Sequence, residues 1–218
     1  MRQVTQADAP ALAQLIRATG LDHNPDPERI ARVSLESNHV TLIETAIDGA
    51  LIGFVDAFST VSSFATPRWE VDLLGVHPTH RGRGIAQSLV REVVKSAQAI
   101  GLTDARALVH VDNRASTNTF LHCGFTLDET IRHLFVSDQE MSEAVIAPLD
   151  THLLSVSTLT YTGIWIEGEQ SLEALCCAQT VRTRYRWDIA GAVIAAAADP
   201  TPLGYELVGQ YRWLKRTL

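Results

Sequence analysis

Apolar residues recur along the first part of the chain with two spacings, and these spacings predict which segments are strands and which are helices. Residues 40–47 and 51–59 are apolar runs joined by Asp48-Gly49, a dipeptide typical of tight hairpins, so they are expected to pair as antiparallel strands. Residues 87–100 instead place apolar side chains three or four positions apart, which predicts a long amphipathic helix.

The other elements predicted in residues 1–136 give the succession β–α–α–β–β–β–α–β–α–β. The remaining strands are predicted at residues 2–5, 69–76, 105–111 and 125–136, and the remaining helices are predicted between Thr5 and Gly20, at 28–37 and at 116–122. Because helices and strands intermix along the chain, the expected fold class is α/β (α+β).

The strand predicted at residues 69–76 is followed by a glycine-rich basic loop. His77-Pro78 ends the strand, because proline has no N–H to donate, and Arg81-Gly82-Arg83-Gly84-Ile85-Ala86 then runs directly into the helix at 87–100. Glycines allow several backbone N–H groups to point at one place, and the helix dipole adds positive potential there. The sequence therefore predicts an anion site at residues 81–86.

The spacing within this loop narrows the choice of anion. The loop lacks the Gly-Lys-Ser/Thr ending of a Walker A motif and the glycine spacing of a dinucleotide fingerprint. It resembles the Arg/Gln-x-x-Gly-x-Gly/Ala pyrophosphate loop of the GNAT superfamily, the acyl-CoA-dependent N-acyltransferases, with Arg81, Gly84 and Ala86 at the fixed positions. Residues 113–125 resemble the second signature of that superfamily, because Asn113 opens a short helix that ends in Gly-Phe.

The resemblance implies a GNAT fold, in which helices flank a mixed central sheet and two central parallel strands, here within 70–76 and 105–111, splay apart to admit pantetheine. It implies direct transfer of an acyl group from acetyl-CoA, or another acyl-CoA, to a primary amine of a small molecule or peptide, with no metal. The residues that would bind the cosubstrate are Leu74, Gly75, Val76, Arg81, Gly82, Arg83, Gly84, Ile85, Ala86, Asn113, Ser116 and Phe120.

Two carboxylates in the strand at 69–76 are candidates for the general base, which must deprotonate an amine that is charged at neutral pH. Alternation is expected to place Val71, Leu73 and Gly75 on one face of the strand and Glu70, Asp72, Leu74 and Val76 on the other. Glu70 stands where many members of the superfamily carry the base, so it is preferred. Asp72, one pleat nearer to the thioester, is the alternative, and either residue would otherwise be a structural surface acid.

The general acid is where this sequence departs from the superfamily. Phe120 stands at the position of the superfamily's tyrosine, and a phenyl ring packs on pantetheine but donates no proton. Ser116 and Cys123 are neighbours of Phe120 on the predicted helix and are alternatives. All four tyrosines of the chain follow residue 160, so a tyrosine acid would have to come from the carboxy-terminal segment or from a partner subunit.

A second hypothesis is a GNAT module that binds acyl-CoA as a ligand or sensor without catalysis. Phe120 favours this hypothesis, whereas the pair Glu70 and Asp72 favours an enzyme. Because the reaction dispenses with an acid more easily than with a base, the enzyme is preferred. A nucleotide-dependent kinase is disfavoured, since a phosphate-site lysine and a set of Mg²⁺ ligands are both missing.

Composition bounds the partners. Residues 1–150 carry 12 Lys and Arg against 19 Asp and Glu, which argues against nucleic acid and mildly for a cationic acceptor, although solubility explains the charge equally well. In residues 21–38, where the superfamily builds its acceptor site, acidic and histidine side chains would either meet that cation or simply cap helices. They are Asp22, His23, Asp26 and Glu28.

The sequence also bounds the compartment of the protein. The three cysteines, two of them adjacent, form no disulfide framework and fit a reducing cytoplasm. The amino-terminal residues do not resemble a signal peptide, and the longest apolar run, residues 189–198, is too short to span a membrane. A soluble cytoplasmic protein is expected, and a homodimer is left open.

Residues 151–218 are interpreted as a degenerate half-copy of the GNAT domain in residues 1–150, with an unrelated α+β extension as the alternative. Four correspondences support the half-copy: 204–213 with 124–133, 170–172 with 87–89, the run ending at 198–199 with the strand ending at 110–112, and 159–166 with the strand at 69–76. The phosphate loop and the short helix are missing from the copy, so one CoA is expected per chain. A strand–helix–strand–strand unit cannot close its own sheet and should pack on the first domain or a partner chain.

Overall fold

The computed structural model describes the chain except for residues 62–64, 142–144, 146–147, 150, 169 and 196–199. The strands are β1 (Arg2–Gln3), β2 (His39–Thr45), β3 (Leu51–Val61), β4 (Pro67–Val76), β5 (Asp104–His110), β6 (Thr126–Leu127), β7 (Arg132–Ser137), β8 (Thr151–Ser157), β9 (Thr162–Gly168), β10 (Ile189–Ile194) and β11 (Glu206–Thr217). The α-helices are α1 (Ala9–Thr19), α2 (Pro27–Val33), α3 (Ile85–Ala99), α4 (Arg114–His122) and α5 (Leu172–Tyr185). Short 3₁₀ turns are η1 (Gln6–Asp8), η2 (Pro78–His80) and η3 (Thr201–Leu203).

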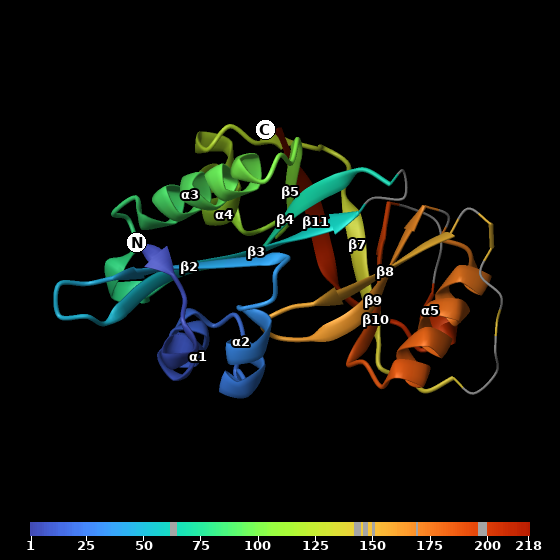
Figure 1. The fold of residues 1–218 in the computed structure, drawn as a ribbon. Coiled ribbons are helices and arrows are strands. Elements are labelled where there is room, and N and C mark those ends of the chain that lie inside the picture. Colours follow the sequence, from blue (N-terminus) through green and yellow to red (C-terminus); the bar gives the residue numbers. More distant parts are fainter. Residues whose placement is uncertain (62–64, 142–144, 146–147, 150, 169, 196–199) are drawn as a thin grey trace.

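The strands form one mixed sheet in the order β1-β2-β3-β4-β5-β11-β7-β10-β9-β8, and β6 pairs with β11. Helices α3 and α4 pack on one face of the amino-terminal strands, α1 and α2 pack on the other face, and α5 packs on β9 and β10 (Figure 1). The predicted α/β (α+β) class, with a mixed sheet flanked by helices, is confirmed. Of the helices described, none is long and apolar enough to cross a membrane.

Local sequence signals account for most elements of the first half. β2 and β3 pair as the predicted hairpin, whose turn is closed by a bond from the Gly49 N–H to the Ala46 carbonyl (3.0 Å). The long helix begins two residues earlier than predicted, at Ile85. The single strand predicted at 125–136 is divided into β6 and β7, because Asp128 between them accepts the Thr130 N–H (3.1 Å) and turns the chain.

A β-bulge in β4 overturns the predicted alternation of its two faces. The pairing of β3 with β4 shifts by one position, which leaves Asp72 as an extra residue in β4. Val71, before the bulge, packs in the core beneath α3, and so does Leu74 after it, whereas Leu73 packs in the core beneath α1. The prediction that Val71, Leu73 and Gly75 share one face is therefore wrong. The inserted residue moves the side chains that follow it to the opposite face of the sheet.

The two central parallel strands part soon after they meet. Within the part of the chain described here, β4 and β5 pair at two positions, Trp69 opposite Ala105 and Glu70 opposite Arg106. Both strands continue beyond these pairs without pairing to each other, so the sheet has a gap between them. This gap matches the splay that the GNAT resemblance implies.

The last strands of the two halves of the chain are exchanged. β11 lies between β5 and β7 and pairs antiparallel with both, and β7 in turn pairs with β10 of the carboxy-terminal half. β9 and β10 are parallel and are joined through α5, as β4 and β5 are joined through α3. The strand predicted at 159–166 corresponds to β9, and Ser171 caps α5 by accepting the Ala174 N–H (3.2 Å). Residues 198–199, which ended the predicted apolar run, lie outside the described residues.

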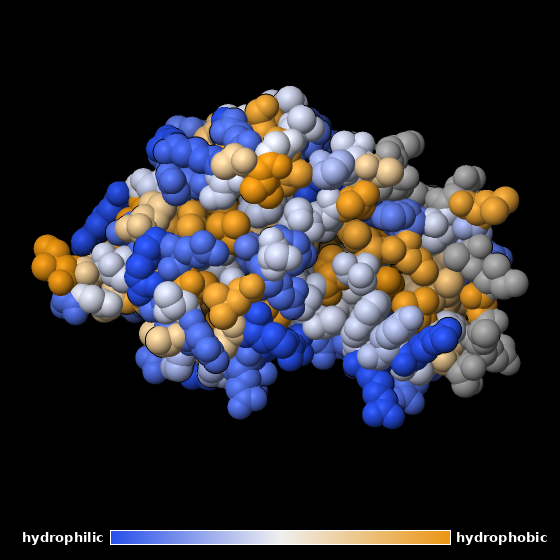
Figure 2. Space-filling model, in the orientation of Figure 1, coloured by the Kyte–Doolittle hydropathy of each residue, from blue (hydrophilic) through white to orange (hydrophobic). Residues whose placement is uncertain are grey.

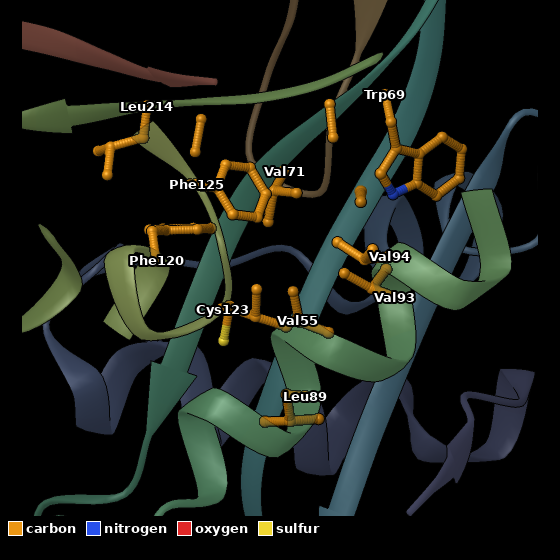
Figure 3. Packing of buried hydrophobic residues seen from close by; sticks show 14 of the residues in the cluster. Val55, Trp69, Val71, Leu89, Val93, Val94, Phe120, Cys123, Phe125 and Leu214 are labelled. Atoms are coloured by element: carbon orange, nitrogen blue, oxygen red, sulfur yellow. The ribbon is translucent and has the colours of Figure 1, made fainter. Parts of the chain in front are cut away.

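Apolar clusters hold these layers together. The first packs α3 and α4 on the central strands and includes Trp69, Leu89, Phe120 and Leu214 (Figure 3). Leu214 belongs to β11 and is fully buried, so a carboxy-terminal strand contributes to the core of the amino-terminal half. Burial of a leucine side chain contributes about 1.5–3 kcal/mol to folding, and the two halves therefore stabilise each other.

Candidate active site

The loop before α3 is exposed at residues 81–84. Gly84 is the N-cap of α3 and has a left-handed backbone with φ of +77°, a conformation that other residues adopt only with strain. The guanidinium groups of Arg81 and Arg83 donate to the carbonyls of Val76 (3.1 Å) and Thr79 (3.3 Å), which fixes the path of the loop. The structure thus brings together in one turn the predicted residues Arg81, Gly82, Arg83, Gly84, Ile85 and Ala86. An N-terminus of this kind suits a pyrophosphate.

A cavity of about 740 Å³ occupies the gap between β4 and β5. Its size is within the usual range of small-molecule sites, about 300–1,000 Å³. Of the residues of β4 predicted to bind the cosubstrate, Leu74 lines the cavity, while Gly75 is buried against Phe54 and Thr19. Val76 lies next to the loop at residues 81–86, half-buried. The lining of the cavity therefore reaches Leu74 in β4, two residues before Val76.

Helix α4 forms one wall of this cavity through Asn113, Ser116 and Phe120. Asn113 is the N-cap of α4, and its side chain accepts the Ser116 N–H (3.0 Å), as the Asn-first motif predicts. The Phe120 ring packs edge-on against Phe125 at 5.0 Å, in the core shown in Figure 3. Cys123 lies in the same core with its Sγ directed at the Gln87 carbonyl (3.5 Å), and burial raises the pKa of this thiol.

Glu70 is held in a network of charges at the point where the two strands part. Its carboxylate accepts from Arg68 Nε (2.6 Å), from Arg106 Nε (2.8 Å) and from the Thr60 hydroxyl (2.9 Å). Glu167 of β9 binds the same two arginines, with 2.6 Å between its Oε1 and Arg106 Nη2. Two arginines and two glutamates thus neutralise one another across the two halves of the chain.

Asp72 differs from Glu70 because no arginine pairs with it among the residues that the structure describes. It lines the cavity at the bulge of β4, where its carboxylate is accessible but surrounded by protein. Burial and then the nearby charge of Asp56 raise the pKa of Asp72 to about 7, while His39 acts in the opposite direction. Asp56 is itself buried, accepting the Thr41 hydroxyl (2.5 Å) with His39 Nδ1 at 3.5 Å. Asp72 is therefore a carboxyl group that can take up and release a proton near neutral pH.

Comparison with known families decides the membership of the chain. The sequence model of the family described as acetyltransferase (GNAT) matches residues 10–125, which is more than half of the chain. The chain belongs to the GNAT family. The predicted superfamily is confirmed.

Individual GNAT proteins resemble the chain over different lengths. The N-alpha-acetyltransferase RimI of Mycobacterium tuberculosis is 29% identical over 122 residues, which are 56% of this chain and 75% of that protein. A GCN5-related N-acetyltransferase from Sphaerobacter thermophilus superposes with a TM-score of 0.61 at 14% identity, covering 99% of this chain and 94% of that one. The yncA structure from Salmonella typhimurium, a putative acetyltransferase with its cofactor acetyl-CoA, superposes with a TM-score of 0.53 at 20% identity. This superposition covers 60% of this chain and 81% of that one. These superpositions show that the fold is shared.

Two tyrosines from beyond the GNAT match reach the cavity. Tyr161 precedes β9, and Tyr211 lies in β11 with its ring edge-on to His110 at 5.2 Å. Burial, followed by the negative charge of Asp72, holds the pKa of Tyr161 well above its usual value, so its hydroxyl keeps its proton at neutral pH. The structure thus offers a tyrosine from the carboxy-terminal segment at the cavity, where the sequence has Phe120 in α4.

The charged residues of the predicted acceptor segment act mainly as caps. Asp26 caps α2 by accepting the Glu28 N–H (2.9 Å), and Asp22 accepts the Asn24 N–H (2.8 Å). From that segment it is Leu21 that lines the cavity. No cluster of His, Cys, Asp and Glu suited to a metal ion occurs among the residues that the structure describes.

Several residues at the cavity had no signal in the sequence. Arg68, Arg106 and Glu167 are distant along the chain and meet only through the pairing of β4 with β5 and the position of β9. The remaining lining residues of the carboxy-terminal half come from strands without a motif. Apart from the tyrosines, which the sequence had indicated as possible acids, most of them are apolar, and this character indicated only that they face an interior.

Proposed function

We propose that this GNAT chain is an acetyl-CoA-dependent N-acetyltransferase that acetylates the primary amine of a small molecule or peptide. The observation that carries the proposal is the position of Asp72. A carboxyl group whose pKa burial raises to about 7 lines a cavity in the gap between β4 and β5, and β4 itself runs on through η2 into the glycine-rich turn before α3. A site that joins a phosphate-binding turn to a base near neutral pH supports acyl transfer to an amine.

The chain's residues fit acetyl-CoA, which when bound would supply the acetyl group as a thioester. The turn at residues 81–86 would bind the pyrophosphate through exposed N–H groups. The edge of β4 beyond Glu70 does not pair with β5, so its backbone groups would be free to bind the amides of the pantetheine arm. Leu74, Gly75 and Val76 would lie on one side of that arm, and Asn113, Ser116 and Phe120 on the other.

Asp72 is the general base in this proposal, and Glu70 is a structural residue. Glu70 is bound by Arg68 and Arg106, and these contacts hold its carboxylate within the charge network. Asp72 would take the proton from the ammonium group of the acceptor, and the backbone N–H groups of β4 near the bulge would stabilise the developing oxyanion. Tyr161 would donate a proton to the departing thiolate. The transfer forms a C–N bond, breaks a C–S bond and releases one proton overall when the acceptor starts as an ammonium ion.

Release of free thiol from acetyl-CoA across a panel of amines tests the proposal. Turnover that depends on both the amine and Asp72 supports an enzyme. Calorimetric binding of acetyl-CoA with no thiol release from any amine would instead favour a non-catalytic acyl-CoA module. Comparison of Asp72→Asn with Glu70→Gln distinguishes the two carboxylates.

We also propose that residues 151–218 are a degenerate half-copy of the GNAT domain in residues 1–150. Gly124 and Gly204 both have a left-handed backbone, with φ of +82° and +77°, and each precedes a buried aromatic residue, Phe125 or Tyr205. β9 and β10 pair at four positions, so the gap found between β4 and β5 is not repeated there. One CoA should therefore bind per chain, and a calorimetric stoichiometry of two would contradict this.

A further inference from the structure

The cavity continues from the gap between β4 and β5 into the carboxy-terminal half of the chain. Its lining there comes from β7 to β11, outside residues 10–125 that match the GNAT family. All of these lining residues except Glu167 and Gln170 are aliphatic or aromatic. Figure 2 shows apolar residues gathered over the carboxy-terminal strands on the face in view. The acceptor end of the cavity is therefore built mainly of apolar side chains.

Aromatic rings are prominent in this lining. Tyr161 and Trp165 lie with their ring centroids 6.2 Å apart, and Trp213 lies in β11 with the Arg106 guanidinium 3.9 Å from its ring centre. Phe58 of β3 and Phe120 of α4 line the same cavity from the amino-terminal half. Rings from both halves thus face one space, which suits a ligand with an aromatic or bulky apolar body.

The position of Trp165 depends on a glycine in the neighbouring strand. Gly191 lies opposite Trp165 in the β9–β10 pair, and a Cβ atom at residue 191 would be 2.7 Å from the indole ring. Any larger residue would displace the ring. Trp165 is therefore held against β10 as part of the cavity wall.

Among the described residues that line the cavity, one carboxylate is not paired with an arginine. Arg68 and Arg106 are each bound to both Glu70 and Glu167, so these four charges cancel. Asp72 of β4 remains outside this network, and so does His110 of β5, which also lines the cavity. One carboxylate at the edge of an apolar chamber fits a ligand with one ammonium group and an otherwise apolar body.

We propose that the acceptor is a small arylalkylamine, with its ammonium group beside Asp72 and its ring among Tyr161, Trp165 and Trp213. This inference rests on the proposed acetyltransferase function. A polyamine would bring further charges into an apolar chamber, and a polypeptide would bring an amide for each residue with few polar side chains to bind it. Trp165 is a specificity-determining residue in this arrangement.

The test compares 2-phenylethylamine with ethylamine, spermidine and an alanyl tetrapeptide as acceptors for the full chain. The value of kcat/KM should be about 10- to 100-fold higher for 2-phenylethylamine than for each of the others, since each buried apolar group adds to binding in the transition state. Trp165→Ala should remove most of this preference, because it should lower kcat/KM for 2-phenylethylamine much more than for ethylamine. Trp165→Phe, which keeps a ring, should restore part of it.

Tyr185→Ala is the matched control, because Tyr185 is an exposed aromatic residue of the same half, in α5, outside the cavity lining. It should leave the preference unchanged. Titration of tryptophan fluorescence with 2-phenylethylamine gives a second readout that needs no turnover, since Trp165 and Trp213 line the cavity.

Equal or faster turnover of spermidine or the peptide would overturn the inference, as would an equal loss for all amines in Trp165→Ala. Saturable fluorescence change with 2-phenylethylamine, without thiol release from any amine, would overturn the proposed acetyltransferase function and support the ligand class. Absence of both turnover and binding of 2-phenylethylamine would overturn the ligand class.

Discussion

Replacing Asp72 with asparagine tests the role of its carboxylate with little change in side-chain size. If Asp72 is the base, the rate of acetylation should rise with pH as this carboxyl group, whose pKa is about 7, ionises. The Asp72→Asn variant should lose this rise, and kcat/KM near pH 7.5 should fall about 10²- to 10⁴-fold, the usual contribution of a general base. Its residual activity should recover at higher pH, where the free amine becomes abundant without help.

The same substitution should stabilise the fold at alkaline pH. The native state holds the Asp72 proton more tightly than an unfolded chain, in which the pKa is near 3.8, so the free energy of unfolding falls as the pH rises from about 4 to about 7. For a carboxyl group fully shielded from water, the difference between the two pKa values corresponds to a loss of about 4 kcal/mol in the free energy of unfolding. Because Asp72 is accessible within the cavity, screening by water reduces this cost to about 1–2 kcal/mol above pH 7.

Urea unfolding at pH 5 and pH 8, together with a pH–rate profile, measures both effects. Asp72→Asn should be more stable than the parent by about 1–2 kcal/mol at pH 8 and by less at pH 5. Glu70→Gln is the matched control and should destabilise the protein at both pH values, because it leaves Arg68 and Arg106 with one carboxylate partner fewer. A parent-like pH–rate profile in Asp72→Asn would refute the assignment of the base. Lower stability of that variant at pH 8 would refute the electrostatic argument.

Two further predictions concern the cosubstrate loop and the general acid. Gly84→Val should weaken the binding of CoA at least about tenfold by calorimetry, because a branched side chain would occupy the phosphate position. Gly101→Val is the control, because Gly101 has a similar φ of +79° at the far end of α3. This variant should share the backbone strain but bind CoA normally. Unchanged affinity of Gly84→Val for CoA would refute the assignment of this loop as the pyrophosphate site. Tyr161→Phe should lower kcat about 10- to 100-fold with little change in the KM for acetyl-CoA, because it removes a proton donor from the cavity. Tyr205→Phe is its control, because the Tyr205 hydroxyl donates to the Leu175 carbonyl (3.0 Å) in the core. This variant should lose about 1 kcal/mol of stability while its kcat stays unchanged. A loss of kcat in both variants would contradict the assignment of Tyr161 as the acid.

The parts of the site that the sequence predicted are those formed by neighbouring residues. The turn at residues 81–86 and the Asn113 cap each depend on a few consecutive positions, and glycine or asparagine is needed there for local backbone reasons. The β2–β3 hairpin was predictable for the same reason. Features of this kind can be predicted from the sequence because they depend on residues that are adjacent in it.

The bulge at Asp72 was not predictable from alternation. A strand that alternates over residues 69–76 gives the same pattern with or without an inserted residue, and only the pairing with β3 reveals the shift. The prediction that Asp72 shares an even pleat with Glu70 therefore misjudged how differently the two carboxylates are surrounded. Glu70 is bound by two arginines, and Asp72 lies open to the cavity.

The carboxy-terminal part of the cavity could not be predicted because it is assembled from distant strands. Arg68 and Glu167 are 99 residues apart in the sequence, and Arg106 and Glu167 are 61 residues apart. Trp165 depends on Gly191 through the register of β9 with β10. Contacts set by strand order leave no periodic signal, so the lining of this part of the cavity became apparent only in the folded chain.

The exchange of β7 and β11 has a consequence for how the protein is made on the ribosome. Tyr211 of β11 pairs with His110 of β5, so β5 must wait for a strand that is synthesised about a hundred residues later. At about 5–20 residues per second, the nascent chain carries β5 as an open sheet edge for about 5–20 s. Open edges invite pairing with other chains, so this interval is when the nascent protein is most exposed to aggregation and most in need of a chaperone. The cavity would form late, because its wall is completed only when β11 inserts beside β5.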